Sequence, residues 1–268
     1  MGEKTNAVPV VTDNKTSDIL HAMLENGTNS ASDGPNPCQD CYLQHHCLVS
    51  DLDTQSKLAI SAITDHPKPF QKSTHIYRQN SAFRSIYIVR SGAVKTYYLD
   101  EDGEENISGF YLAGEMFGFD GVGKNGHRYS AQALDTTAVC SIKYHDFEKL
   151  FAQHPRIQQL FTSVLCNELY ARQQPLLRLR QHAAEECLTL FLLDISERLS
   201  RSQKATEFTL PMPRRDIARY LSLAEETLSR LFRRLQDKGP LRVSGRKVTH
   251  FDEASFRAKN TSAIANRQ

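Results

Sequence analysis

Four cysteine residues could together bind a metal ion or an iron–sulfur cluster. Cys38, Cys41 and Cys47 lie within ten residues, in the spacing C-x2-C-x5-C, and Cys140 follows far downstream. Iron–sulfur clusters take four thiolates from a protein, and structural zinc sites also accept cysteine sulfur. The spacing differs from the paired C-x2-C knuckles of common zinc ribbons. Three alternatives follow: an iron–sulfur cluster, a structural zinc ion, or unligated thiols that act as a disulfide switch.

The other cysteines and the nearby histidines are expected to have other roles. Cys166 and Cys187 fall on apolar helical stripes, so we expect both to be buried small hydrophobic residues. His45 and His46 lie inside the cysteine segment. Because four cysteines are available as ligands, we expect these two histidines to be solvated or to lie beside the site without binding it.

A helix-turn-helix pattern occurs near the C-terminus. Pro213 suits the start of a first helix over residues 214–221, followed by a tight turn at 222–224 and a second helix over 225–238. Residues 241–249 are expected to form a two-stranded wing. The apolar residues predicted to form the shared core of the two helices are Ile217, Leu221, Leu228 and Leu231.

The second of these helices could read a DNA sequence. Glu226, Ser229 and Arg230 lie at positions i, i+3 and i+4, so they share one helix face. A recognition helix presents its N-terminal residues to the major groove, where Arg binds guanine, Glu accepts from cytosine and Ser serves either. The alternative is a helical hairpin that does not bind DNA. Four further arginines are predicted to contact phosphates: Arg214, Arg215, Arg233 and Arg234.

The distribution of charge supports a polyanionic partner. Residues 213–250 carry ten Lys or Arg residues and four acidic residues, a net charge of +6. The whole chain carries only +2, so the remainder carries −4. A basic module on a slightly acidic body suits nucleic acid.

The spacing of apolar residues, which predicts the strands and helices that position the cysteines and the reading residues, changes along the chain. From Pro67 to about Ile142, short alternating apolar runs are separated by glycine turns, which predicts an antiparallel β barrel or roll. After Pro155, apolar residues recur every three or four positions to about Gln181, which predicts a long helix. This stripe is either core packing or a dimer seam. Pro175 should kink the helix or remove one of its backbone hydrogen bonds.

Length and composition set limits on the class of protein. A chain of 268 residues that is 40% hydrophobic and 24% charged is typical of one large or two ordinary globular domains. No apolar stretch approaches the length of a membrane span, and the N-terminus lacks the features of a secretory signal. We therefore expect a cytoplasmic protein. His127 and His145 lack the carboxylate grouping of a metalloenzyme, and no nucleophile elbow or phosphate loop is found, so we expect no enzyme activity.

Residues 36–250 resemble the Crp/Fnr family of transcription regulators and, within it, the oxygen-sensing FNR type. Besides the cysteines, the resemblance is carried by Arg-Ser-Gly-Ala-Val-Lys at 90–95, Ile-Ser-Gly-Phe-Tyr-Leu-Ala-Gly-Glu at 107–115, Ala-Gln-Ala-Leu at 131–134, Val-Cys at 139–140 and Glu-Thr-Leu-Ser-Arg at 226–230. It implies an α+β fold with an N-terminal antiparallel β-roll of the cyclic-nucleotide-binding type, a long dimerisation helix and a C-terminal winged helix-turn-helix. The expected divisions are a flexible segment at 1–36, a cluster loop and sensor roll at 37–154, the dimerisation helix at 155–182, the DNA-binding domain at 183–250 and a tail at 251–268.

The resemblance also implies a cofactor and partners. It implies a [4Fe–4S] cluster on the four cysteines Cys38, Cys41, Cys47 and Cys140. It implies a homodimer that binds palindromic DNA with TTGAT-like half-sites in the absence of oxygen, and contact with RNA polymerase through the turn at Gly103 and Glu104. It implies no membrane partner. The residues expected at the dimer seam are Ile157, Phe161, Val164, Leu165, Leu169 and Leu176.

The chain departs from the family pattern at several positions. Arg172 stands where the FNR pattern has an acidic residue, and we hypothesise that Tyr42 and His46 slow the attack of oxygen on the cluster. The phosphate-binding pattern of cyclic-nucleotide receptors is also altered, because its Glu is missing and Arg128 is displaced by one residue. On a strand such a shift turns a side chain to the other face. We therefore expect no cyclic nucleotide to bind.

Overall fold

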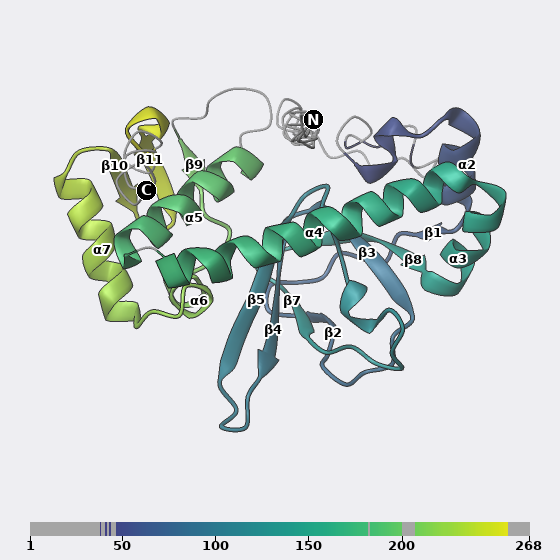
Figure 1. Cartoon of the computed structure of the whole chain (residues 1–268), viewed down its shortest axis with the longest axis horizontal. Helices are drawn as coiled ribbons and strands as arrows, with labels where there is room; N and C mark the ends of the chain where they lie inside the picture. The colour runs from purple at the N-terminus through teal and green to yellow at the C-terminus, as the bar shows by residue number, and fades with distance from the viewer. Residues whose placement is uncertain are drawn as a thin grey trace, which may run out of the picture.

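The computed structural model describes residues 38, 41, 43, 47–181, 183–199 and 207–256, without the side chains of residues 48, 51 and 171–181. It contains a β-roll, a long helix that crosses the roll, and a small helical module at the end of that helix (Figure 1). The predictions made for residues 1–36, for Tyr42, His45 and His46, and for the side chains of Arg172, Pro175 and Leu176 lie outside the described part.

The β-roll consists of two four-stranded antiparallel sheets, with strand orders β1-β8-β3-β6 and β2-β7-β4-β5. The predicted alternating runs form the longer strands, because alternate side chains must face the interior between the sheets. The aromatic rings of Tyr77, Tyr87 and Phe117 stack in that interior. The strand bounds are β1 (Thr64–Asp65), β2 (His75–Tyr77), β3 (Ser85–Ser91), β4 (Ala93–Leu99), β5 (Glu105–Leu112), β6 (Met116–Phe117), β7 (Ser130–Ala133) and β8 (Ala138–Lys143).

One glycine turn is required by packing as well as by backbone conformation. Gly92, between β3 and β4, has a φ of +79°. A Cβ atom at this position would lie 2.6 Å from the carbonyl oxygen of Thr136. Glycine therefore permits the close approach of two backbones where the chain passes from one sheet to the other.

Helices cover one end of the roll and then cross it. A 3-10 turn η1 (Leu48–Asp51) leads to α2 (Thr54–Ala62), whose first turn is capped by the Asp53 carboxylate through the Ser56 N–H at 3.0 Å. After β8 come α3 (Tyr144–Gln153) and α4 (Pro155–Gln181). Pro155 occupies the first position of α4, where its missing N–H removes no helical bond. The 27 residues of α4 form one helix about 40 Å long, which continues through Pro175 without a break.

The C-terminal module is a winged helix-turn-helix. It contains α5 (Ala184–Leu199), β9 (Phe208–Thr209), α6 (Arg214–Tyr220), α7 (Glu225–Asp237), β10 (Leu241–Ser244) and β11 (Lys247–Phe251). Strands β10, β11 and β9 form a small antiparallel sheet, which contains the predicted wing. The four predicted core residues are all buried between the helices. Ser222, in the turn between α6 and α7, has a left-handed φ of 54°, a conformation that is strained for a residue other than glycine.

The roll and the C-terminal module share a buried junction that was not predicted. Residues of β4 and β5 belong to the same apolar cluster as the helix-turn-helix core. At its edge the Lys95 Nζ lies 3.3 Å from Asp216 Oδ2 and 2.8 Å from Glu105 Oε2. The side chains of Lys95 and Asp216 are only 3% and 2% exposed. Arg219 of α6 adds contacts to Glu104 at 3.0 Å and to Glu105 at 3.1 Å. The hairpin of β4 and β5 therefore holds α6 by charge as well as by apolar packing.

Within the described residues, no helix is both long enough and apolar enough to cross a membrane.

Candidate sulfur pocket and DNA-reading surface

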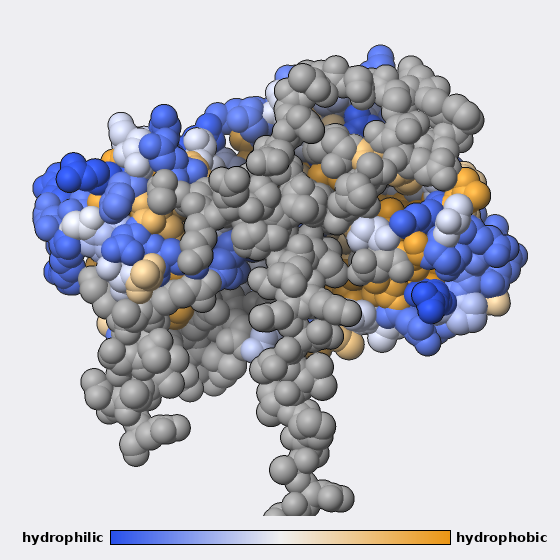
Figure 2. All heavy atoms as spheres, turned by 90° about the horizontal axis from the view of Figure 1, so that it is seen from above, coloured by the Kyte–Doolittle hydropathy of each residue, from blue (hydrophilic) through white to orange (hydrophobic). Residues whose placement is uncertain are grey.

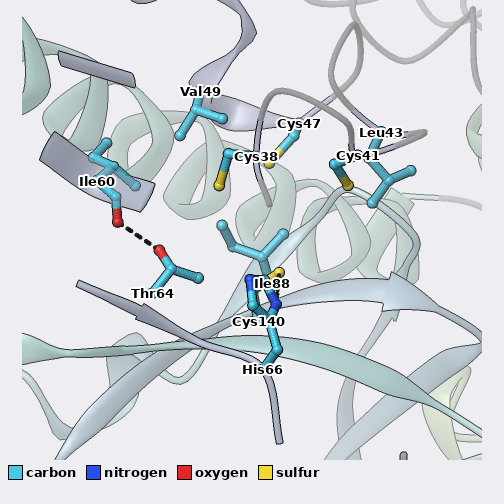
Figure 3. A pocket seen from close by; sticks show the side chains of 10 residues that line it. All are labelled: Cys38, Cys41, Leu43, Cys47, Val49, Ile60, Thr64, His66, Ile88 and Cys140. Carbon is cyan, nitrogen blue, oxygen red and sulfur yellow. Dashed lines mark hydrogen bonds between the residues drawn. The ribbon is translucent and has the colours of Figure 1, made fainter. Parts of the chain in front are cut away.

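The four predicted ligand cysteines line one cavity (Figure 3). Cys38, Cys41 and Cys47 come from the segment before η1, and Cys140 comes from the middle of β8. The antiparallel pairing of β3 with β8 sets Cys140 opposite Ile88 and fixes it at the edge of the cavity. The fold therefore brings together sulfur atoms that are widely separated in the sequence. The other described residues that line the cavity are Leu43, Val49, Ile60, Thr64, His66 and Ile88.

The environment of the cavity favours neutral thiols in the absence of a positive ion. Cys140 is only 8% exposed, and burial together with the three other cysteines raises the pKa of its thiol. Burial also raises the pKa of the Cys38 thiol, against a hydrogen bond with Ser61 that lowers it. A metal ion or cluster that takes these sulfurs as thiolates must therefore displace protons, and its positive charge would offset the penalty of burial.

The donor set suits a thiolate-bound cofactor, whereas the present spacing does not form a closed coordination shell. Four sulfurs without a carboxylate are the ligands of iron–sulfur and structural zinc sites. Among the described residues, no group of three or more His, Cys, Asp or Glu side chains has metal-binding geometry. The cavity volume is about 20 Å³, which is about the space of one water molecule. A cluster would therefore fit only if the cysteine segment moves outward from β8.

His66 is a polar neighbour of the cavity that sequence reasoning missed. Its Nδ1 lies 3.6 Å from the Sγ of Cys140. The cause is strand register: β1 pairs Thr64 with Ile142 and Asp65 with Ser141, and His66, which follows β1 directly, lies beside Cys140. Desolvation and the positive charge of Arg90 lower the pKa of His66. Only this pairing, which a single sequence does not display, connects position 66 with position 140.

The two remaining cysteines differ from each other. Cys187 is buried in the core of the C-terminal module, as expected. Cys166 is exposed on α4, so the prediction that it is a buried hydrophobic residue is wrong. Cys166 lies on the same face of α4 as the exposed residues Thr162, Ser163 and Asn167, away from the buried face.

The reading residues lie on the exposed face of α7. Glu226, Ser229 and Arg230 are all exposed near the start of this helix, and its opposite face is buried. The surface over the C-terminal module, at the left in Figure 2, is largely hydrophilic. This arrangement leaves the three side chains available for contact with the edges of bases. The buried residues of α7 are Leu228, Leu231, Phe232 and Leu235.

The four predicted phosphate contacts are not equivalent. Arg215 and Arg233 are exposed. Arg234 lies 3.5 Å from the carboxylate of Glu185, which also pairs with Lys238. Arg214 is half-buried, because its guanidinium stacks 4.0 Å from the centre of the Phe232 ring. Arg214 and Arg234 therefore have a role within the chain that the sequence did not reveal.

The predicted dimer residues divide along α4. Ile157 and Phe161 are buried in the same apolar cluster as Cys140, so the structure corrects their assignment to the seam and places them in the sensor core. Val164 and Leu165 are half-buried against that cluster. Leu169 is 61% exposed, and Tyr170 beside it is also exposed. The apolar side chains that α4 exposes therefore begin near its middle, with Leu169 and Tyr170.

The turn predicted to contact RNA polymerase lies at the tip of the hairpin formed by β4 and β5. Gly103 has a φ of 79°, and the Asp100 carboxylate accepts the N–H groups of Asp102 at 3.2 Å and Glu104 at 2.8 Å. Glu104 is exposed but also pairs with Arg219 of α6. The turn is thus held by hydrogen bonds of its own, and one of its acids faces the chain's own DNA-binding module.

Aromatic side chains fill the described interior of the roll beside the altered phosphate-binding segment. The rings of Tyr77 and His127 stack with their centres 3.7 Å apart. Asp120 accepts the N–H groups of Arg128 at 2.7 Å and Tyr129 at 3.0 Å. Burial raises the pKa of the Asp120 carboxyl, but the hydrogen bond with His127 and these two amides outweigh it, so that the pKa lies below its ordinary value. Asp120 thus occupies the backbone amides of Arg128 and Tyr129.

Comparison with known proteins agrees with this architecture. The model of the cyclic nucleotide-binding domain matches residues 67–154, and the model of the Crp-like helix-turn-helix domain matches residues 188–258. The transcriptional activator protein Anr of Pseudomonas protegens is 38% identical over 216 residues, which cover 80% of this chain and 88% of Anr. The fumarate and nitrate reduction regulatory protein of Escherichia coli is 36% identical over 213 residues, covering 79% of this chain and 85% of that protein.

A solved structure with the same fold is FixK2 from Bradyrhizobium japonicum. It superposes with a TM-score of 0.67 at 30% identity, over 73% of this chain and 96% of FixK2. A β-roll joined by a long helix to a winged helix-turn-helix is the architecture of a DNA-binding transcriptional regulator. The chain belongs to the Crp/Fnr family, whose members bind DNA and dimerise. Regulators of this family are not enzymes, which confirms the expectation from the sequence.

Proposed function

We propose that this chain is an oxygen-responsive regulator of transcription that works in the cytoplasm under anaerobic conditions. In this proposal Cys38, Cys41, Cys47 and Cys140 hold a [4Fe–4S] cluster, which when bound supplies oxygen-sensitive iron chemistry. The observation that carries the proposal is the convergence of four thiols on one apolar cavity in a chain that also has a helix-turn-helix. A relative that is 38% identical over 213 residues is named the anaerobic regulatory protein of Pasteurella multocida, which supports the same proposal.

The core around the cavity offers a physical route from the cysteines to the dimer helix. Cys47 and Cys140 pack in one apolar cluster with Ile157 and Phe161 at the start of α4. Outward movement of the cysteine segment would change the packing of that cluster, and α4 is the rigid element that leaves it. Leu169 and the helical turns beyond it would pair with a second copy. Loss of the pairing would remove one of the two half-site contacts and lower DNA affinity.

DNA recognition in this proposal divides into base contacts and backbone contacts. Glu226, Ser229 and Arg230 would read each half of a palindromic site with TTGAT-like half-sites. Arg215 and Arg233 are exposed and would bind phosphates, with Arg214 and Arg234 as weaker contributors because they already have partners in the chain. The turn with Gly103 and Glu104 would contact RNA polymerase.

A cyclic nucleotide is not expected as the signal. Asp120 occupies the backbone amides near the altered phosphate segment, and the Tyr77 and His127 rings fill the adjacent interior. A nucleotide phosphate placed there would face a carboxylate in a partly desolvated position, which is unfavourable.

The first test is the visible absorption spectrum of protein purified or reconstituted without oxygen, followed during exposure to air. A broad iron–sulfur band that bleaches within minutes, with iron and sulfide each near four per chain, is the expected result for a [4Fe–4S] cluster. A colourless protein that contains zinc or only thiols would overturn the cluster assignment. Cys166→Ala is the matched control, because Cys166 lies outside the cavity and its loss should leave the spectrum unchanged.

DNA binding tests the second half of the proposal. Anaerobic protein should bind a palindrome of two TTGAT half-sites more tightly than a shuffled duplex, and air should reduce the difference. Equal affinity for both duplexes under anaerobic conditions would contradict the proposed reading face.

A further inference from the structure

The histidine at the end of β1 has a defined place beside one sulfur of the cavity. His66 directly follows β1, which pairs with β8, and its imidazole Nδ1 lies 3.6 Å from Cys140 Sγ. In Figure 3 the His66 ring lies against Cys140, on the opposite side from the segment that carries Cys38 and Cys41. The distance is within the range of a hydrogen bond to sulfur. The contact belongs to the rigid, strand-borne side of the cavity.

The other polar side chains at the cavity have partners elsewhere. The Thr64 hydroxyl donates to the carbonyl oxygen of Ile60 at 2.7 Å. The Ser61 hydroxyl bonds to Cys38, on the other side of the cavity. Leu43, Val49, Ile60 and Ile88 complete the described wall and have no side-chain donor. Among the described residues that line the cavity, His66 is therefore the one whose side-chain nitrogen is placed to bond to Cys140.

We propose that His66 is a positioning residue that donates a hydrogen bond from Nδ1 to the thiolate of Cys140 and so stabilises the cluster against oxidation. The proposal rests on the cluster assignment above. A thiolate can only accept a hydrogen bond, so a neutral imidazole facing it at this distance carries its proton on Nδ1. The N–H would replace part of the solvation that the buried sulfur loses.

We expect this hydrogen bond to affect both the reduction potential of the cluster and the orientation of the Cys140 ligand. Hydrogen bonds to cluster sulfurs are among the factors that set the reduction potential, because they stabilise negative charge on the sulfur. Groups that bond to ligands also fix the orientation of those ligands, and their loss typically weakens metal binding about 10- to 100-fold. Loss of the N–H should therefore lower the potential of the cluster and make its oxidative loss faster. His66 is exposed on its outer side, so its replacement should not disturb the core.

The test compares two variants of similar size. His66→Asn can place an amide N–H near the position of Nδ1, whereas His66→Leu has no donor. Each protein is reconstituted without oxygen, its reduction potential is measured by anaerobic titration, and the bleaching rate is measured in air. We expect His66→Leu to have a lower potential than the parent and to lose its cluster about tenfold faster, and His66→Asn to stay close to the parent.

The outcomes separate this inference from the proposed function. A loaded parent protein with equal changes in the Leu and Asn variants, or no change in either, overturns the role of His66 and leaves the cluster assignment intact. A parent protein that takes up no cluster overturns both. Thermal unfolding of the apo-proteins serves as the control for folding, because an exposed residue should alter the transition little. If His66→Leu does not fold, the Asn variant against His66→Ala provides the same comparison.

Discussion

The sulfur cavity and the proposed reading face of α7 differ in how far their functional side chains are exposed to solvent. The cavity buries its functional groups: Cys140 is nearly inaccessible, and its thiol is held neutral by burial. The reading face exposes its groups, because Glu226, Ser229 and Arg230 extend from a helix whose other side is buried. We therefore expect a change in the cavity to act through folding and through binding of the proposed cofactor, and a change on the exposed face of α7 to act on DNA binding alone. The following predictions test that contrast, from the largest effect to the smallest.

Replacement of the strand-borne ligand should abolish the function of the cavity. Cys140→Ala is expected to reduce iron and sulfide to background after anaerobic reconstitution, because three remaining thiolates cannot complete a four-sulfur site. The C-terminal module should still fold, since the apolar cluster that it shares with β4 and β5 does not contain Cys140. Iron content, sulfide content and far-ultraviolet circular dichroism measure these effects. Iron content equal to that of the parent would exclude Cys140 as a ligand.

The junction between the β-roll and the C-terminal module contains a buried ion pair, so its disruption should strongly destabilise the fold. Lys95→Met removes the Nζ that lies 3.3 Å from buried Asp216, and we expect a loss of about 3–5 kcal/mol in the free energy of unfolding. Denaturant titration of the apo-protein measures this loss. Adding Asp216→Leu should recover part of it, since the unpaired charge is then removed.

An exposed ion pair provides the control for that experiment. Lys149 lies 3.3 Å from Asp146, and both side chains are exposed. Lys149→Met should change the free energy of unfolding by less than about 1 kcal/mol. Equal effects of the two lysine substitutions would show that the junction is not a buried charge site.

The connecting helix should show a pH dependence that the reading face lacks. Burial and the negative charge of Glu115 raise the pKa of Glu168 on α4 to about 7, against the opposing effect of the Arg198 charge. The Tyr111 hydroxyl donates to Glu168 at 2.8 Å. Between an ordinary glutamate pKa of about 4.5 and the folded value, the folded chain keeps a proton that the unfolded chain has lost. The stability due to this proton is therefore lost as pH rises through that window, by at most about 3 kcal/mol.

The uncharged analogue tests this assignment. Glu168→Gln keeps an acceptor for Tyr111 and remains neutral, so its free energy of unfolding should vary less between pH 4.5 and 7 than that of the parent. Denaturant titrations at several pH values provide the measurement. Parallel pH profiles for the two proteins would assign the titration to another group.

Substitutions on the proposed reading face should change DNA binding and leave the free energy of unfolding unchanged. Arg230→Ala is expected to weaken binding by about 1–3 kcal/mol and to relax the preference at one base pair, without a change in stability. Arg233→Ala is the matched control: as a phosphate contact it should weaken binding to all sequences alike and reduce the salt slope by about one. A uniform loss in the Arg230 variant would make it a backbone contact instead.

The sequence was most informative where structure is determined locally. The alternating runs of β3, β4, β5 and β8 and the i, i+3, i+4 face of α7 follow from the periods of strand and helix. The three clustered cysteines could be grouped from their spacing, with Cys140 as the candidate fourth thiolate. The resemblance to a family implied the same set, and the fold places all four around one cavity.

The missed features depend on register and on packing between distant segments. His66 meets Cys140 only through the pairing of β1 with β8, and Lys95 meets Asp216 only where the hairpin docks on α6. The apolar pattern of α4 did not distinguish residues that face the roll from residues that face a partner. For that reason Ile157 and Phe161 were assigned to the seam, and Cys166 to the core.

The length of α4 gives it the geometry of a lever. One end is embedded among the residues that pack beside the cysteines, and the DNA-binding module follows the other end (Figure 1). A tilt of about 5° at the embedded end displaces the far end of a helix about 40 Å long by about 3.5 Å. That displacement is about the 3.4 Å rise between successive base pairs. A small repacking beside Phe161 would thus shift each recognition helix by one base-pair step, enough to put two linked helices out of register with a palindrome.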